Sequence, residues 1–343
     1  MRRSQRRFIR WVLFIIVIAL IAFVAKRHYW PASQPADTQP AKPEVNGLSG
    51  PTDRMPTTQD APPTPTPTVK KASPADRSAA LALLEQGMGL YRQKKHLDAR
   101  STLADALNTS ALPEKQAETA RAKLSELADR MLFSRKVFPN DPCTFAYTFQ
   151  SGDVPVRVER KLKLRVPAQL IQKINNIPDA TKIQIGQTLK LIRGPFHAVI
   201  SKSRCVMDVF LEEPKTGGKI FVRRFRVGVG MDGSTPAGQW CVSLGGKMTH
   251  APWTPPASSN LPRKRIQWGQ PGYPLGKMGY WISIEGIGKT PYTREDGYGI
   301  HGTNNPDSIG KASSLGCIRL ADDDIEMVFA MLYEKWSTVT VLP

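Results

Sequence analysis

A proline-rich stretch divides this 343-residue chain into a short N-terminal part and a long C-terminal part. Eleven of its 29 prolines lie between Pro31 and Pro74, among Thr, Ala, Gln and Ser and almost no large apolar residues. Such a stretch cannot bury enough apolar surface to form a core. We therefore expect residues 31–74 to be a disordered, semi-extended linker. The chain that follows it is long enough to bury a sizeable core without disulfides.

An apolar run from Trp11 to Ala25 precedes this linker, with five arginines in the ten residues before it. Together with the flanking aromatic residues, the run reaches roughly the 20 residues that span a bilayer. Cleavage after Ala25 would place the bulky Phe23 at position −3, which disfavours a signal-peptide site. The sequence thus predicts an uncleaved signal anchor at residues 11–30. Residues 1–10 would stay in the cytoplasm, and the chain after the anchor would lie in the periplasm or cell wall.

Charge and cysteine content narrow the classes of partner and cofactor. The formal net charge is +19, which indicates an anionic partner. Export excludes nucleic acid and leaves anionic wall polymer or lipid headgroups. The cysteines form no CxxC pair, so a structural zinc site is not expected. It stays open whether they are thiols or disulfides; they are Cys143, Cys205, Cys241 and Cys317.

Residues 75–138 carry apolar side chains at spacings of three and four, which predicts helices that Ser73 or Asp76 caps. The spacing of their small and apolar residues resembles one tetratricopeptide (TPR) helical hairpin with a third helix behind it. These residues are Gly87, Ala99, Leu103 and Ala106, and Pro113 comes after them. Because one repeat cannot form an extended concave surface, we expect a small helical spacer and not a partner-binding array.

Residues 143–195 contain "YTFQSGD", "INN" and "KIQIGQTLKL" in that order. These three motifs resemble a LysM module. The resemblance implies a strand, two helices and a strand, and binding of glycans that contain N-acetylglucosamine, such as peptidoglycan. Val154 and Pro155 depart from the residues usual in the family. The alternative is a module of the same fold that serves as a rigid spacer without binding sugar.

Residues 196–343 read as a mostly β domain. The segments "HAVISKSRCVMDVFLEE" and "KIFVRRFRVGVGM" alternate apolar and polar residues around a "PKTGG" turn, and "MGYWISIEG" and "STVTVLP" are similar. One helix is predicted in "DDDIEMVFAMLYEKW", whose N-terminal acidic residues suit the helix dipole. The whole chain is therefore expected to be multidomain.

Two glycine motifs in this part look like nucleotide-binding loops. "GVGMDG" at 228–233 matches G-x-G-x-x-G, but "STPAG" follows it where a helix would have to begin. "GIGKT" at 286–290 lacks the earlier glycine of a phosphate loop, because Ser283 occupies that position. Neither motif predicts a nucleotide cofactor.

The stretch "HGTNNPDSIGKASSLGCIRL", residues 301–320, contains a cysteine and a histidine that suit nucleophilic catalysis. Cys317 needs a base, which His301 can provide, and a nearby cation, which Arg319 can provide. The amides of Gly316 and Cys317 are candidates to hold an oxyanion. Spacing alone, however, equally allows a buried thiol beside an unrelated histidine.

Three segments resemble the L,D-transpeptidase (YkuD) catalytic domain over residues 196–343: "YGIHGTNNPDSIGKASSLGCIRL", "RVGVGMDGSTPAGQW" and "PGYPLGKMGYW". The resemblance implies that Cys317 is the nucleophile, that His301 is its base and that the Gly302 carbonyl orients the imidazole. It places three further residues beside the nucleophile, namely Ser314, Gly316 and Arg319. The implied pocket residues are Tyr298, Thr303 and Leu315, of which Leu315 replaces a histidine found in many members.

The reaction that this resemblance implies is acyl transfer without a metal or organic cofactor. Cys317 would form a thioester with a peptidoglycan tetrapeptide stem, release D-Ala and pass the acyl group to an amine on a neighbouring stem, making a 3–3 crosslink that affects cell shape. Carbapenems, a class of β-lactam, are expected to acylate the same thiol. Two alternatives stay open: an L,D-carboxypeptidase or exchange enzyme on the same scaffold, and a non-catalytic peptidoglycan-binding protein. The intact Cys317 and His301 weigh against the latter.

Overall fold

The computed structural model describes residues 72–256 and 262–343. The chain divides into two compact units at residues 68 and 69, and the described ranges belong to the second unit. The anchor expected at 11–30 and nearly all of the expected linker lie outside these ranges. Within the described ranges, no helix is long and apolar enough to cross a membrane.

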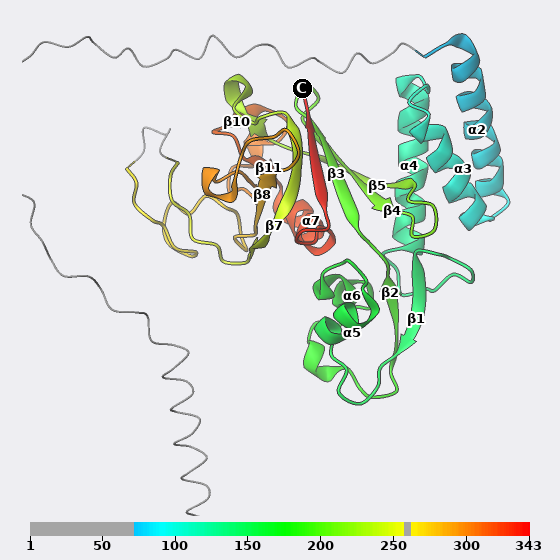
Figure 1. The fold of residues 1–343 in the computed structure, drawn as a ribbon, viewed down its shortest axis with the longest axis horizontal. Coiled ribbons are helices and arrows are strands. Elements are labelled where there is room, and N and C mark those ends of the chain that lie inside the picture. Colours follow the sequence, from blue (N-terminus) through cyan, green and yellow to red (C-terminus); the bar gives the residue numbers. More distant parts are fainter. Residues whose placement is uncertain (1–71, 257–261) are drawn as a thin grey trace, which may run out of the picture. The chain divides into compact units, whose positions relative to one another are not determined.

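Three helices form the N-terminal part of the described chain: α2 (Pro74–Arg92), α3 (His96–Asn108) and α4 (Glu114–Met131) (Figure 1). The start of α2 follows the expected cap, because the Ser73 hydroxyl accepts from the Asp76 amide at 3.1 Å and the Asp76 carboxylate accepts in return from the Ser73 amide at 3.1 Å. The linker therefore ends one residue earlier than expected, because Pro74 is already the first residue of α2.

The small residues of this segment permit close packing of α2 and α3. A Cβ at Gly87 would lie 2.8 Å from the Leu103 side chain, and Ala99, Leu103 and Ala106 have no exposed surface. These helices share their core with Phe221 of strand β5 (Lys219–Arg226). The segment is therefore not a separate spacer, since α4 packs directly on the sheet (Figure 1).

Residues 143–195 have the expected order of strand, helix, helix, strand. The elements are β1 (Thr144–Thr148), α5 (Pro155–Leu162), α6 (Ala168–Ile174) and β2 (Thr188–Ile192). β1 and β2 are antiparallel, with Thr144 opposite Ile192. Pro155 is the first residue of α5, where its missing N–H costs no hydrogen bond, so this departure from the LysM pattern is compatible with the helix.

The rest of the chain forms an eight-stranded mixed sheet in the order β11-β9-β8-β7-β12-β3-β4-β5. Its strands are β3 (Phe196–Ser201), β4 (Val206–Glu212), β5, β7 (Gly238–Met248), β8 (Trp281–Gly286), β9 (Gly299–Gly302), β11 (Ile318–Leu320) and β12 (Thr338–Leu342). A short parallel pair joins β6 (Val229–Gly230) to β10 (Ala312–Ser314). The expectation of a mostly β domain with one C-terminal helix is confirmed.

Two details of this domain differ from the sequence prediction. The first predicted strand is a hairpin, β3 and β4, whose turn places Cys205 at φ +50°. The C-terminal helix α7 (Asp322–Met331) is shorter than the predicted segment, which continues to Trp336. The buried ammonium of Lys247 donates to the carbonyls of Phe329 and Leu332, at 2.5 and 2.7 Å, and so caps the helix there.

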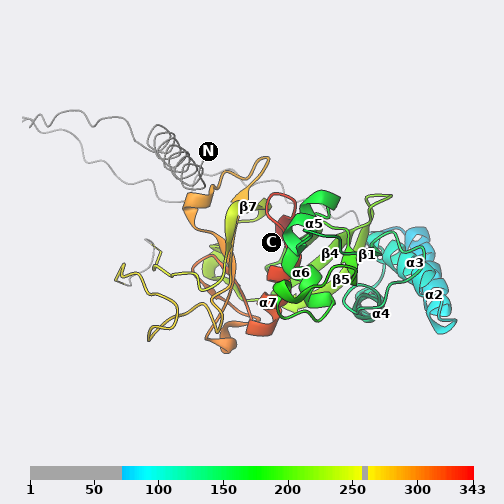
Figure 2. The ribbon, with the colours of Figure 1, turned by 90° about the horizontal axis from the view of Figure 1, so that it is seen from below.

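One buried lysine joins residues 143–195 to the helices. Lys190 on β2 is 2% exposed. Its ammonium donates to the carbonyls of Met131, Ser134 and Lys136 at and just beyond the end of α4. Residues 143–195 also contact the C-terminal helix: α6 lies against α7 (Figure 2), and Lys173 of α6 pairs with Glu326 of α7 at 2.6 Å. Burial lowers the pKa of Lys190 to about 8.

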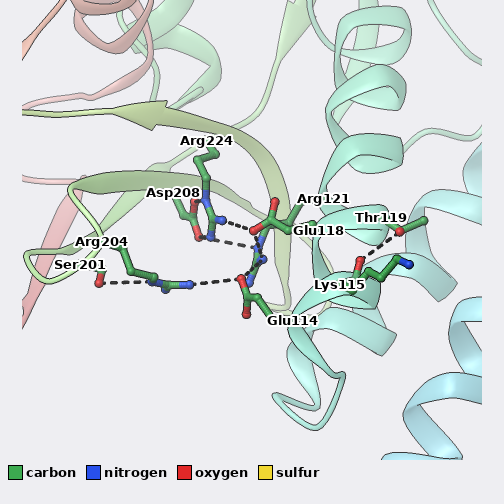
Figure 3. A network of polar contacts seen from close by, with 9 residues as sticks. All are labelled: Glu114, Lys115, Glu118, Thr119, Arg121, Ser201, Arg204, Asp208 and Arg224. Carbon is green, nitrogen blue, oxygen red and sulfur yellow. Dashed lines mark hydrogen bonds and ion pairs between the residues drawn. The ribbon is translucent and has the colours of Figure 1, made fainter. Parts of the chain in front are cut away.

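Charged side chains also join α4 to the hairpin of β4 and β5 (Figure 3). Arg224 of β5 donates to both carboxylate oxygens of Asp208 on β4, at 2.6 and 2.8 Å, and it also pairs with Glu118 of α4. Arg121 donates to Glu118 at 2.7 Å within α4. The helix therefore adds an ionic contact to the apolar contact it makes with the edge strand.

Candidate active site

The loop that carries Cys317 connects β10 to β11 and is held by Ser314. The buried Ser314 hydroxyl donates to the Cys317 carbonyl at 2.6 Å and accepts from the Gly316 amide at 3.1 Å. Gly316 has φ +131°, a conformation that favours glycine. A Cβ there would also lie 2.9 Å from the Ser234 carbonyl oxygen. The Gly316 amide thus donates to Ser314, in contrast to the expectation that it faces an oxyanion.

Thr235 fixes the same loop from the other side, a role that sequence reasoning missed. Its buried hydroxyl donates to the Gly316 carbonyl at 2.7 Å and accepts from the Gly230 amide at 2.8 Å. Thr235 lies in the "STPAG" loop, where no helix begins. The glycine-rich segment before it therefore supports the loop that carries Cys317.

His301 lies on β9 and is 6% exposed. Its Nδ1–H donates to the Gly302 carbonyl at 2.6 Å, which leaves Nε2 without a proton and able to accept one. In the sheet, His301 is opposite Trp281 of β8, and the two rings stack with centroids 5.3 Å apart. Trp281 is a second residue that the sequence reasoning missed. The Trp281 ring and the Gly302 carbonyl together set the orientation of the imidazole.

Burial keeps both reactive groups neutral near pH 7. It raises the pKa of the Cys317 thiol to about 11, although the Arg319 charge acts in the opposite direction. It lowers the pKa of His301 to about 4, to which Arg319 also contributes. The thiol donates weakly to the Gly297 carbonyl, with 3.6 Å between sulfur and oxygen. The resting thiol is therefore not ionised near pH 7.

A cavity of about 840 Å³ contains the thiol and the imidazole. Seven of the residues expected in the site line it: Tyr298, His301, Thr303, Ser314, Leu315, Cys317 and Arg319. The two others, Gly302 and Gly316, act through their backbone carbonyls, which accept from His301 and Thr235. Leu315 is 41% exposed and gives the cavity an apolar wall.

Part of the cavity wall comes from the segment between β7 and β8. Trp253 and Ile266 pair in an antiparallel bridge, with N–H···O contacts of 2.9 and 2.8 Å. Both side chains pack on the buried residues Ala251, Tyr273 and Leu275. Cavity-lining residues that the sequence reasoning missed include Trp253, Arg263, Arg265, Trp281, Glu295 and Asp296. Trp281 ends the segment "PGYPLGKMGYW", but the resemblance assigned it no role; the others belong to no motif, so only their place in the fold reveals them.

All four cysteines are free thiols in the structure. Burial raises the pKa of Cys143 to about 12 and also raises that of Cys241. Across residues 72–256 and 262–343, no group of three or more His, Cys, Asp or Glu side chains is arranged to hold a metal ion.

The β domain is similar to a known protein family. Residues 195–341 match the YkuD family model, described as the L,D-transpeptidase catalytic domain. A Bacillus subtilis protein named as the L,D-transpeptidase YkuD is 49% identical over 71 residues, which cover 21% of this chain and 36% of that protein. The Escherichia coli protein ErfK/SrfK, also named as an L,D-transpeptidase, is 32% identical over 114 residues, or 32% of this chain and 33% of that one. These matches span about a third of each relative's length.

The solved structures that match this chain have lower sequence identity to it. An L,D-transpeptidase from Mycobacterium smegmatis is 15% identical, with a TM-score of 0.32 over 46% of this chain and 64% of that one. The L,D-transpeptidase LdtMt1 in complex with imipenem is 13% identical, with a TM-score of 0.30 over 47% of this chain and 76% of that one.

Proposed function

We propose that this protein is a cell-wall L,D-transpeptidase that uses Cys317 as an acyl-accepting nucleophile. One observation carries the proposal: the Cys317 thiol and the His301 imidazole line one cavity, and the Gly302 carbonyl accepts from that imidazole, inside the segment that matches the YkuD model. The proposed donor is a peptidoglycan tetrapeptide stem. The proposed products are free D-Ala and a 3–3 crosslink.

The first half-reaction forms the acyl-enzyme. The Cys317 sulfur attacks the carbonyl carbon that precedes D-Ala while His301 Nε2 takes the thiol proton. The Gly302 carbonyl accepts from Nδ1 and so stabilises the imidazolium. The C–N bond to D-Ala then breaks, the imidazolium gives its proton to the leaving amine, and a thioester remains on Cys317.

The second half-reaction decides between transfer and hydrolysis. A side-chain amine of a neighbouring stem attacks the thioester, His301 takes a proton from that amine, and the thiol is restored. If water attacks instead, the product is a shortened stem, and the enzyme is an L,D-carboxypeptidase. The apolar wall formed by Leu315 disfavours water beside the thioester and so supports transfer.

Localisation and binding partners follow from the same proposal. The expected anchor would hold the enzyme in the cytoplasmic membrane, and residues 143–195 would hold it on peptidoglycan glycan, raising the local concentration of stems. The solved structure of LdtMt1 is a complex with the carbapenem imipenem. We extend this ligand class to the present chain and propose that carbapenems acylate Cys317.

The test is intact-mass spectrometry of the protein incubated with a tetrapeptide stem or with a carbapenem. We expect one acyl adduct on the unmodified protein and none on Cys317→Ala. Cys241→Ala is the matched control and should keep the adduct, because its thiol lies on β7 next to Glu285 and outside the cavity. The same adduct on Cys317→Ala would contradict the assignment.

Muropeptide analysis of sacculi then identifies the reaction. Crosslinked 3–3 dimers support transfer, and shortened stems alone support the carboxypeptidase. Unchanged sacculi together with an unmodified Cys317 support a non-catalytic binding protein.

A further inference from the structure

Besides Arg319 next to Cys317, the cavity has two further cationic side chains that the reaction above does not use. Arg263 and Arg265 both line it and are both exposed. Of the carboxylates in residues 72–256 and 262–343, none lies within 4.0 Å of either guanidinium. Both guanidinium groups are therefore free of ion pairs with the described residues.

Several other arginines of the sheet domain, both half-buried and exposed, are engaged. Arg223 pairs with Asp129, and Arg224 pairs with Asp208. Arg294 donates to the carbonyls of two residues of β7 at 2.9 Å each. Arg226 on β5 is exposed and also has no ion pair in the described ranges, but it does not line the cavity. Arg263 and Arg265 are thus the exposed, unpaired arginines that face the cavity, and no carboxylate of the described residues pairs with them.

The backbone holds these two arginines on the cavity side. Ile266, which follows them, is fixed by its antiparallel bridge to Trp253. The Lys264 amide donates to the Pro262 carbonyl at 2.7 Å, which closes a three-residue turn centred on Arg263. Arg263 and Arg265 line the cavity, and Lys264 does not. The same apolar cluster that holds Ile266 contacts Trp281, the ring that stacks on His301. The arginine segment is therefore anchored to the residue that orients the proposed base.

We propose, resting on the proposed function, that Arg263 and Arg265 bind free carboxylate groups of the donor stem and make the enzyme selective for unamidated stems. A guanidinium matches the planar geometry of a carboxylate and can donate two parallel hydrogen bonds to it. The proposed stem offers two sources, the terminal carboxylate of D-Ala and the side-chain carboxylate of diaminopimelate. Glu295 and Asp296 also line the cavity, and their negative charges repel both of these carboxylates. The arginines must therefore supply the attraction.

The experiment measures binding by calorimetry on the full chain carrying Cys317→Ser, so that failure of the chemistry does not hide binding. The ligands are the tetrapeptide with both carboxylates free, the same peptide with its D-Ala amidated, and the same peptide with its diaminopimelate amidated. We expect Arg263→Gln and Arg265→Gln each to raise the Kd for the free peptide roughly 3- to 10-fold, and the double variant to raise it more than 10-fold. The peptide lacking the recognised carboxylate should bind weakly and respond little to the variants.

Lys264→Gln is the matched control, because it removes a positive charge between the two arginines without changing the cavity wall. It should leave every Kd within about twofold. Equal affinity for all three peptides, or equal losses from Lys264→Gln and Arg263→Gln, would overturn the proposal even if Cys317 is acylated. Selective binding without acylation would retain carboxylate recognition and refute the proposed chemistry.

Discussion

Two neutral groups, a thiol and an imidazole, form the centre of the proposed site. Many cysteine nucleophiles are ionised by a cation or a helix terminus. Here burial raises the pKa of Cys317 to about 11 and lowers that of His301 to about 4, so the two values are too far apart for proton transfer in the resting state. In the proposed reaction, the thiol proton would therefore move to His301 only when a substrate carbonyl is under attack.

This gives a pH prediction for the resting enzyme. Since a raised thiol pKa lowers the thiolate fraction at every pH below about 11, alkylation of Cys317 by iodoacetamide should be slow at pH 7 and rise roughly tenfold per pH unit up to about pH 10. His301 titrates near pH 4 and should add no step between pH 5 and 9. Peptide mapping of Cys317 after timed alkylation measures the rate. A rate that stays flat between pH 6 and 9 would contradict this and indicate a preformed thiolate–imidazolium pair.

Among the secondary-structure elements, the ends of the helices are fixed by buried lysines. Lys247 on β7 caps α7, and Lys190 on β2 binds three carbonyls at the end of α4. In each case a strand supplies the cation and a distant helix supplies the acceptors. An ammonium with its donors satisfied in this way fixes the distance between two elements, which apolar packing alone does not.

Replacing Lys190 by methionine tests this role. Methionine keeps much of the apolar stem but leaves the carbonyls of Met131, Ser134 and Lys136 without their donor, so the free energy of unfolding should fall by about 2–4 kcal/mol. Urea denaturation followed by circular dichroism measures it. The control is Lys182→Met, an exposed position in the same module, which should change stability by less than about 0.5 kcal/mol. Equal stability of the two variants would argue against the cap.

At the scale of the whole described unit, the helices cover one end of the sheet. β5 is an edge strand, and an uncovered edge invites pairing with other chains. α4 packs on β5, Phe221 is 1% exposed within the core of the helices, and Arg224 pairs with Glu118. The helical segment therefore belongs to the catalytic unit structurally, whatever partner it has.

Removing residues 1–131 should consequently cost solubility. We expect this truncated protein to aggregate in size-exclusion chromatography, because it exposes Phe221 and the edge of β5. The matched control starts at residue 72 and should elute as a single compact species. A truncated protein that stays soluble and is still acylated at Cys317 would show that the helices are dispensable.

Sequence reasoning found some of these features and missed others for physical reasons. His301, Ser314 and Cys317 lie in one continuous motif, and the structure brings them to one cavity, as expected. Thr235 and Trp281 reach the site only through the loop after β6 and through the pairing of β8 with β9, which spacing along the chain does not encode.

The same limit applies to larger elements. Helix periodicity predicted α2, α3 and α4, and alternation predicted most strands of the sheet. The contact between α4 and β5 could not be predicted, because it joins residues about a hundred positions apart. The predicted LysM function and the signal anchor stay predictions.

The order of the elements along the chain also affects when the helices that cover β5 can form. Helices form from local contacts within microseconds, whereas sheet pairing between distant strands is slower. α2, α3 and α4 precede every strand of the eight-stranded sheet in the chain, so during synthesis they emerge before the edge that they cover. The helices that cover β5 are thus already synthesised when this edge strand appears, so they are available to pack on it and on Phe221 as soon as it does.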